Sequence, residues 1–190
     1  VADTHNKTLG LPEIRLGIHP GLGGTVRTVR LTGALVALDL MLTGRSISPR
    51  KAVDIGLIDG IASPEDLDQV AATYIHNRPK PPRAPWYLRI LNMRVLRPLV
   101  ARVLEKKVAK RAPRTHYPAP YAIINLWRQY GGLNKAAYDA EALSFGRLLV
   151  SNSSKNLVRV FFLRERLRNL APRESEVTRL HVIGAGVMGG

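Results

Sequence analysis

Hydrophobic residues recur at helical spacing in two adjacent stretches near the start of the chain, and a glycine follows each stretch. These glycines, Gly33 and Gly44, stand where left-handed helix caps are expected. Ser48 and Ser63 each precede a proline, which is the preferred order of residues at the start of a helix. The pattern therefore predicts several short helices within residues 1–77.

A shorter apolar stretch in the same part of the chain, residues 57–62, predicts a strand because turn residues bound it, and a further strand is expected at residues 9–16. Strands that alternate with short helices are typical of α/β proteins. We therefore expect the first 77 residues to form part of an α/β domain.

The next part of the chain, to about residue 178, has helical periodicity almost throughout. Pro98 is expected to kink the first of its helices, and Pro118 and Pro120 to bracket a break before the second. The last three helices end at or near a glycine pair, a polar turn or Pro172. The four predicted helices are residues 88–103, 121–130, 135–150 and 154–170.

Positive charge is concentrated in one segment of the chain. The net charge is +15, but residues 1–77 carry −1, residues 78–114 carry +11 and residues 115–190 carry +5. Prolines cluster at residues 78–85, which predicts a linker. The basic segment 86–114 is open to three interpretations: a solvated helix face, a patch for the phosphates of a ligand, or a helix at a membrane surface.

The composition excludes several classes of protein. With 45% hydrophobic and 23% charged residues, the chain can bury a core and is neither collagen-like nor wholly disordered. It contains no cysteine, which excludes disulfide scaffolds, thiolate zinc sites and cysteine nucleophiles. No run reaches the roughly 18 apolar residues of a spanning helix. Without a recognised nucleic-acid motif, or aromatics interleaved with the basic run, we expect no nucleic-acid binding.

The end of the chain carries a glycine motif. A short apolar run, residues 179–183, leads into G-A-G-V-M-G, with glycines at 184, 186 and 189. This is the G-x-G-x-x-G pattern in which a strand, a tight turn and a helix N-terminus hold a pyrophosphate. The motif predicts the first strand and glycine turn of a Rossmann domain. Because the chain also begins with Val1 rather than Met, we expect it to be a fragment.

A second motif lies near the start of the chain. Residues 11–27 read L-P-E-I-R-L-G-I-H-P-G-L-G-G-T-V-R, and L-T-G-R at 42–45 and A-V-D-I-G-L-I-D at 52–59 continue the match. These stretches resemble the crotonase, or enoyl-CoA hydratase/isomerase, superfamily. His19 stands where that family usually has an apolar residue, a departure that could alter the acyl pocket.

The three parts together resemble the α-subunit family of the bacterial fatty-acid oxidation complex, with H-Y-P-A-P at 116–120 as a further match. The resemblance implies an α/β fold class made of the C-terminal part of a crotonase-like (ClpP/crotonase) domain, a helical linker and the start of a Rossmann domain. Its domains would be residues 1–77, a basic helical linker region at 78–178, and a truncated NAD-binding domain at 179–190.

The resemblance implies roles for individual residues. Glu13 would be catalytic, one of two glutamates that activate water for addition to a trans-2-enoyl-CoA, the second lying upstream of Val1 together with an oxyanion-hole N–H. NAD would bind at the glycine motif, and no metal is expected, since no His, Asp or Glu cluster has metal-ligand spacing. The cofactor-binding residues would be Gly184, Gly186, Met188 and Gly189; the substrate-binding residues would be Pro20, Gly21, Gly23 and Glu165.

Other expectations stay open at this point. By resemblance, the protein would be cytoplasmic and pair with a thiolase β-subunit, and the isolated 190-residue chain would be inactive and bind NAD no better than millimolar. Glu165 is equally well a solvated helix charge, His19 and His181 are packing or hydrogen-bonded residues, and His116 is unassigned. The alternatives are a crotonase-fold isomerase or a hydratase of another acyl-CoA with a non-functional dehydrogenase domain, or a basic membrane-surface module.

Overall fold

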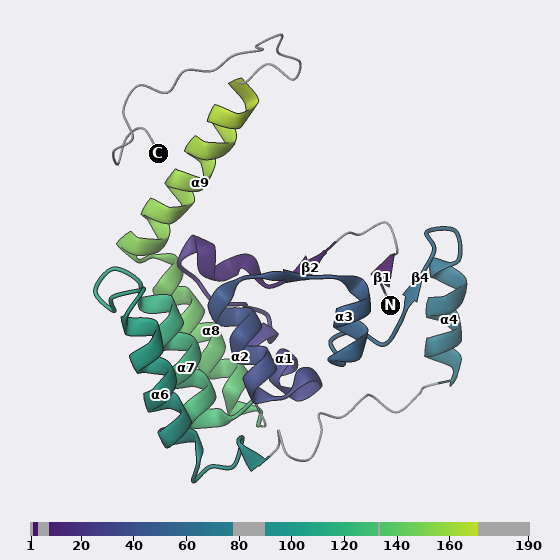
Figure 1. Ribbon diagram of the computed structural model, residues 1–190, viewed down its shortest axis with the longest axis horizontal. Helices are drawn as coiled ribbons and strands as arrows, with labels where there is room; N and C mark the ends of the chain where they lie inside the picture. Colours follow the sequence, from purple (N-terminus) through teal and green to yellow (C-terminus); the bar gives the residue numbers. More distant parts are fainter. Residues whose placement is uncertain (1, 4–7, 78–89, 133, 171–190) are drawn as a thin grey trace. The chain divides into compact units, whose positions relative to one another are not determined.

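The computed structural model describes residues 2–3, 8–77, 90–132 and 134–170 (Figure 1). The chain divides into two compact units, residues 1–158 and residues 159–190. The predicted linker at 78–85 and the predicted Rossmann segment at 179–190 lie outside the described residues. The first unit contains Glu13 and the proline- and glycine-rich turn at residues 20–24, which is called the glycine turn from here on.

Helices make up most of this unit, and its strands are two residues long. The strands are β1 (Ala2–Asp3), β2 (Leu9–Gly10), β3 (Ser46–Ile47) and β4 (Ile61–Ala62). The helices are η1 (Pro12–Leu16), α1 (Gly24–Thr32), α2 (Ala34–Thr43), α3 (Pro49–Asp54), α4 (Leu67–Asn77), α6 (Arg97–Ala109), α7 (Pro118–Tyr130), α8 (Ala136–Leu149) and α9 (Asn152–Leu170), the last continuing into the second unit.

The strands pair in two small sheets rather than one. β1 pairs with β4 in parallel and β2 pairs with β3 in antiparallel register. The predicted strand at 9–16 is wrong after Gly10, because Pro12 opens the 3-10 helix η1. The predicted strand at 57–62 shortens to β4, since the chain after α3 turns back and the Leu57 N–H donates to the Ala52 carbonyl (2.8 Å).

The predicted helix ends are confirmed in most cases. Gly44 is a left-handed cap (φ 60°), whereas Gly33 has positive φ (81°) with extended ψ (161°) and joins α1 directly to α2. The Ser48 hydroxyl accepts from the Lys51 N–H (3.2 Å) and caps α3. Ser63 instead caps a turn, with its hydroxyl accepting from the Asp66 N–H (3.2 Å), and α4 begins after that turn.

The prolines of the helical part begin helices instead of interrupting them. Pro98 lies in the first turn of α6 and does not kink it, and Pro118 and Pro120 lie in the first turn of α7 rather than around a break. Proline is tolerated there because a first-turn N–H has no carbonyl partner within the helix. α7 ends at Gly131 (φ 62°), as predicted, and the predictions of α8 and α9 are also confirmed.

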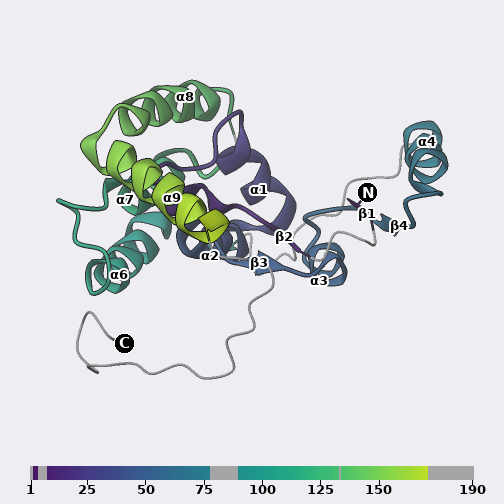
Figure 2. The same ribbon diagram turned by 90° about the horizontal axis from the view of Figure 1, so that it is seen from above.

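One hydrophobic core joins the residues before and after the predicted boundary at residue 77. Helices α1 and α2 pack against each other, α2 packs against α7, and α7 packs against α6 and α8 (Figure 2). Its buried members come from both sides of the boundary: Val29, Ala34, Ala37, Leu38, Met41, Ala101, Ile123, Ile124 and Trp127. The predicted helical linker region, residues 78–178, thus supplies four of these nine buried residues.

A smaller core lies under the β2–β3 pair, where Leu40, Ile47 and Ala52 are buried. The main core, by contrast, extends directly beneath η1 and α1, the elements that carry the crotonase-like motif.

Among the described residues, no helix combines the length and hydropathy needed to cross a membrane.

Candidate active site

Glu13 lies in the first turn of η1, the short helix between β2 and the glycine turn. Gly17 ends this helix in the left-handed conformation (φ 72°), and its N–H donates to the Ile14 carbonyl (3.1 Å). The Glu13 side chain is half-buried, and its Oε2 is buried without a hydrogen-bond partner among the described residues. Because buried polar atoms are nearly always paired, this oxygen makes Glu13 a candidate for contact with a ligand.

Gly17 is required at the end of η1 for two reasons. Its φ is one that side chains with a Cβ rarely adopt, and a Cβ would approach the Ser154 Cα within 3.1 Å and the Leu157 side chain within 3.0 Å. The end of η1 therefore lies directly against the first residues of α9. This close approach sets where the Glu13 backbone sits.

The turn after η1 brings together the three residues predicted to bind substrate in the first unit. Pro20 is buried, Gly21 lies against the Phe145 ring, and Gly23 is left-handed (φ 84°). Between them Leu22 also has positive φ (54°), which is unusual for a residue with a branched side chain, and its side chain is 95% exposed. The turn thus presents a strained backbone and one apolar side chain to the outside.

The structure adds a carboxylate that sequence reasoning missed. Glu141, on α8, is only 1% exposed and accepts hydrogen bonds from the N–H groups of Gly23 (2.5 Å) and Thr25 (2.9 Å) and from the Thr25 hydroxyl. These donors lie at the N-terminus of α1, where unpaired N–H groups and the helix dipole favour a negative charge. The available signal was a glutamate on the buried stripe of α8, between Ala137 and Leu148.

His19 is fully buried beside both carboxylates, which confirms its prediction as a hydrogen-bonded packing residue. Its Nδ1 lies 2.9 Å from the Pro20 carbonyl, which can only accept, so Nδ1 carries the proton. Its Nε2 lies 3.0 Å from the Ser144 hydroxyl and therefore accepts from it. The ring also meets the Phe145 ring edge to face, at 5.9 Å between centroids.

Burial lowers the pKa of His19 below its ordinary value of 6.5. The hydrogen bond to Pro20 and then the negative charges of Glu141 and Glu13 oppose this effect without overcoming it. The imidazole is therefore neutral at pH 7, in agreement with its accepting role toward Ser144.

This pKa shift predicts a pH dependence of stability. The unfolded chain binds a proton at His19 more readily than the folded chain does, so the free energy of unfolding should fall as pH drops below 6.5 toward the folded pKa. Measured by urea unfolding, the free energy of unfolding should fall less with decreasing pH for His19→Gln than for the wild type. His76→Gln, at an exposed histidine, is the control and should behave like the wild type. Equal pH dependence of all three proteins would contradict the prediction.

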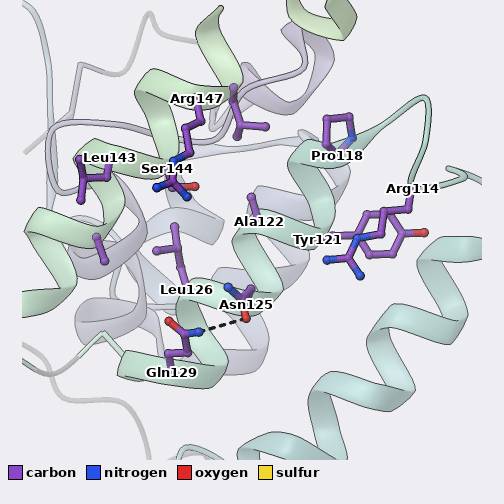
Figure 3. A pocket seen from close by; sticks show the side chains of 12 residues that line it. Arg114, Pro118, Tyr121, Ala122, Asn125, Leu126, Gln129, Leu143, Ser144 and Arg147 are labelled. Atoms are coloured by element: carbon purple, nitrogen blue, oxygen red, sulfur yellow. Dashed lines mark hydrogen bonds between the residues drawn. The ribbon is translucent and has the colours of Figure 1, made fainter. Parts of the chain in front are cut away.

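A groove of about 480 Å³ opens between α7 and α8, and Ser144, the partner of His19, is among the residues that line it. Arg114 and Arg147 line it together with apolar side chains, including Leu126 and Leu143 (Figure 3). The guanidinium of Arg114 lies over the Tyr121 ring, 5.3 Å from its centroid. Glu13 does not line this groove, so the groove and the glycine turn are distinct features.

The remaining predicted site residues belong to the second unit or lie outside the described residues. Glu165 lies on α9 in the second unit, where its carboxylate accepts from Arg168 (2.8 Å) one helical turn away. The cofactor-binding positions Gly184, Gly186, Met188 and Gly189 lie outside the described residues, as does His181. His116 is exposed, and its carbonyl accepts from the Ser153 hydroxyl (2.7 Å). Within the described ranges no three His, Asp or Glu side chains could hold a metal ion.

The site consists of a half-buried glutamate on a short helix and a proline- and glycine-rich turn that leads into α1 and packs against α8. Residues 1–110 match the enoyl-CoA hydratase/isomerase family, a match that covers more than half of the chain. The chain therefore belongs to the enoyl-CoA hydratase/isomerase family. The match continues past residue 77 to the end of α6, whose Ala101 is buried in the core that it shares with α1 and α2.

Proposed function

We propose that this protein hydrates trans-2-enoyl-CoA thioesters in fatty-acid β-oxidation, with Glu13 as a catalytic residue. The observation that carries the proposal is the buried Oε2 of Glu13, which has no hydrogen-bond partner among the described residues, in a member of the hydratase/isomerase family. Pro20, Gly21 and Gly23 would form the substrate-binding turn, in which Pro20 and Gly23 are buried and Leu22 is exposed.

The chemistry of hydration gives Glu13 its role. Water adds to C3 of the enoyl thioester and loses a proton, while C2 gains a proton, so groups that accept and donate protons must flank the double bond. Because no described residue hydrogen-bonds to the Oε2 of Glu13, that oxygen would be able to take up a water proton or return one. The resemblance to crotonases implies that the second of these groups would be a glutamate upstream of Val1.

We further propose that the 3-hydroxyacyl-CoA product is oxidised by an NAD-dependent dehydrogenase region of the same protein. This proposal rests on the sequence motif alone, with Gly184, Gly186, Met188 and Gly189 near the pyrophosphate and Glu165 near the substrate. The same proposal includes a cytoplasmic location and a thiolase β-subunit as partner. It includes no binding of nucleic acid.

One observation favours an additional role for the basic segment in surface contact. Leu99 and Val103 are more than half exposed at helical spacing on α6, with Arg102 and Lys106 exposed beside them. An exposed apolar stripe flanked by cations suits the interface of an anionic membrane. Residues 90–114 would make this contact, extended by residues 86–89, which lie outside the described residues.

The proposed activity is tested with three substrates on the intact protein. We expect loss of the conjugated absorbance of a trans-2-enoyl-CoA, and NADH formation from the matching 3-hydroxyacyl-CoA. A trans-3-enoyl-CoA tests the alternative within the family, which is isomerisation of the double bond. Isomerisation without hydration would replace the proposed reaction, and hydration without NADH formation would leave the hydratase and remove the dehydrogenase.

A further inference from the structure

One face of α8 covers the whole glycine turn. Tyr138, Glu141 and Phe145 follow one another at spacings of three and four residues, which places them on the same side of the helix. Tyr138 lies against Gly23, where a Cβ would come within 2.7 Å of its ring, and Phe145 lies against Gly21. α8 therefore contacts the turn at both Gly21 and Gly23.

Glu141 makes the directional contacts of this face. Its two carboxylate oxygens accept from three donors on Gly23 and Thr25, and the side chain is removed from solvent. Hydrogen bonds to an ionised acceptor are stronger than neutral ones, and they are stronger still where water is excluded. Glu141 thus determines where the end of the turn and the start of α1 lie.

The other end of the turn is held from the same helix. Ser144, one turn after Glu141, donates its hydroxyl proton to His19 Nε2, and the opposite side of that ring holds the Pro20 carbonyl. The turn is therefore fixed at both ends by side chains more than 110 residues away in the sequence. Between these ends lies the strained and exposed residue Leu22.

We propose that Glu141 is a positioning residue for the acyl-CoA reaction, which acts through the N–H groups of Gly23 and Thr25 to hold the glycine turn in its substrate-binding conformation. This inference rests on the proposed function, in which that turn contacts the thioester. Two consequences follow: α8 belongs to the active site, and the loss of Glu141 weakens substrate binding more than it slows the chemical step.

The test compares variants of the intact protein by KM and kcat for trans-2-enoyl-CoA. Glu141→Gln keeps the size of the side chain but replaces one accepting oxygen by a donor facing N–H groups, and should raise KM roughly tenfold with a smaller change in kcat. Asp139→Asn makes the same chemical change at an exposed position two residues away and should leave both constants unchanged.

Variants at Thr25 keep the test independent of whether Glu141→Gln folds. Thr25→Val removes one donor to Glu141 and should raise KM about threefold, whereas Thr25→Ser retains the hydroxyl and should restore the wild-type value. In the double variant with Glu141→Gln, the effect of Thr25→Val should disappear, because the two residues act through one interaction.

Two results would overturn the inference. One is an unchanged KM in both Glu141→Gln and Thr25→Val; the other is a fall in kcat that merely follows the folded fraction measured by circular dichroism. Failure of the proposed function looks different, because the wild-type protein would then show no hydration. An active wild type with unaltered Glu141 and Thr25 variants would remove the positioning role and leave the hydratase in place.

Discussion

Glu13→Gln is expected to lower kcat for hydration about 10³-fold, the usual contribution of a positioned acid or base. The amide has nearly the size of the carboxyl group but cannot take a proton from water. Because Glu13 Oε2 has no hydrogen-bond partner within the described residues, its replacement breaks no internal contact of that atom. The thermal unfolding temperature should therefore stay near that of the wild type, and the loss should appear in kcat at saturating substrate.

The matched control for this prediction is Glu65→Gln, the same substitution at an exposed position. It should retain wild-type hydration. NADH formation from 3-hydroxyacyl-CoA should persist in Glu13→Gln, since the proposed dehydrogenase residues are separate. Near-normal hydration by Glu13→Gln would end the assignment of this residue.

The second large effect concerns stability. Ile124→Ala should lower the free energy of unfolding by about 3 kcal/mol, as large-to-small changes in packed cores do. Ile124 lies on α7, is completely buried, and belongs to the core that includes Leu38 and Met41 of α2. The substitution should therefore destabilise the segments on both sides of residue 77 together.

Unfolding by urea, followed by circular dichroism and by limited proteolysis, measures this effect. Ile75→Ala is the control, because that isoleucine on α4 is 74% exposed and should cost less than 1 kcal/mol. Separate transitions for residues 8–77 and 90–149, with only the latter shifted, would show that the two segments do not share one core.

Local chemistry allowed much of the helical structure to be predicted. The ends of α2 and α7 follow from Gly44 and Gly131, because glycine adopts positive φ without a steric penalty. The start of α3 follows from Ser48, whose hydroxyl reaches an N–H three residues on. Glu13 and the glycine turn could be recognised for a similar reason, since their motif is continuous in the sequence.

Predictions went wrong where a local signal had two outcomes. Pro98 and Pro118 were expected to kink or bracket helices, yet each lies in a first helical turn, where proline is equally well tolerated. The sequence predicts a strand over residues 9–16, but β3 pairs only with Leu9 and Gly10. An apolar run cannot by itself report how long a strand its neighbour will pair with.

The sequence by itself determined most of the helix caps and the family motif, and it predicted Glu13 as the catalytic residue, because each depends on residues within a few positions of one another. Only the tertiary structure decided that Glu141 and Ser144 hold the glycine turn, across separations of 118 and 125 residues. From the sequence alone, a glutamate on a helix is expected to be solvated, because its tertiary contacts are not known. It is the packing of α8 against α1 that removes water from Glu141 and leaves backbone N–H groups as its partners.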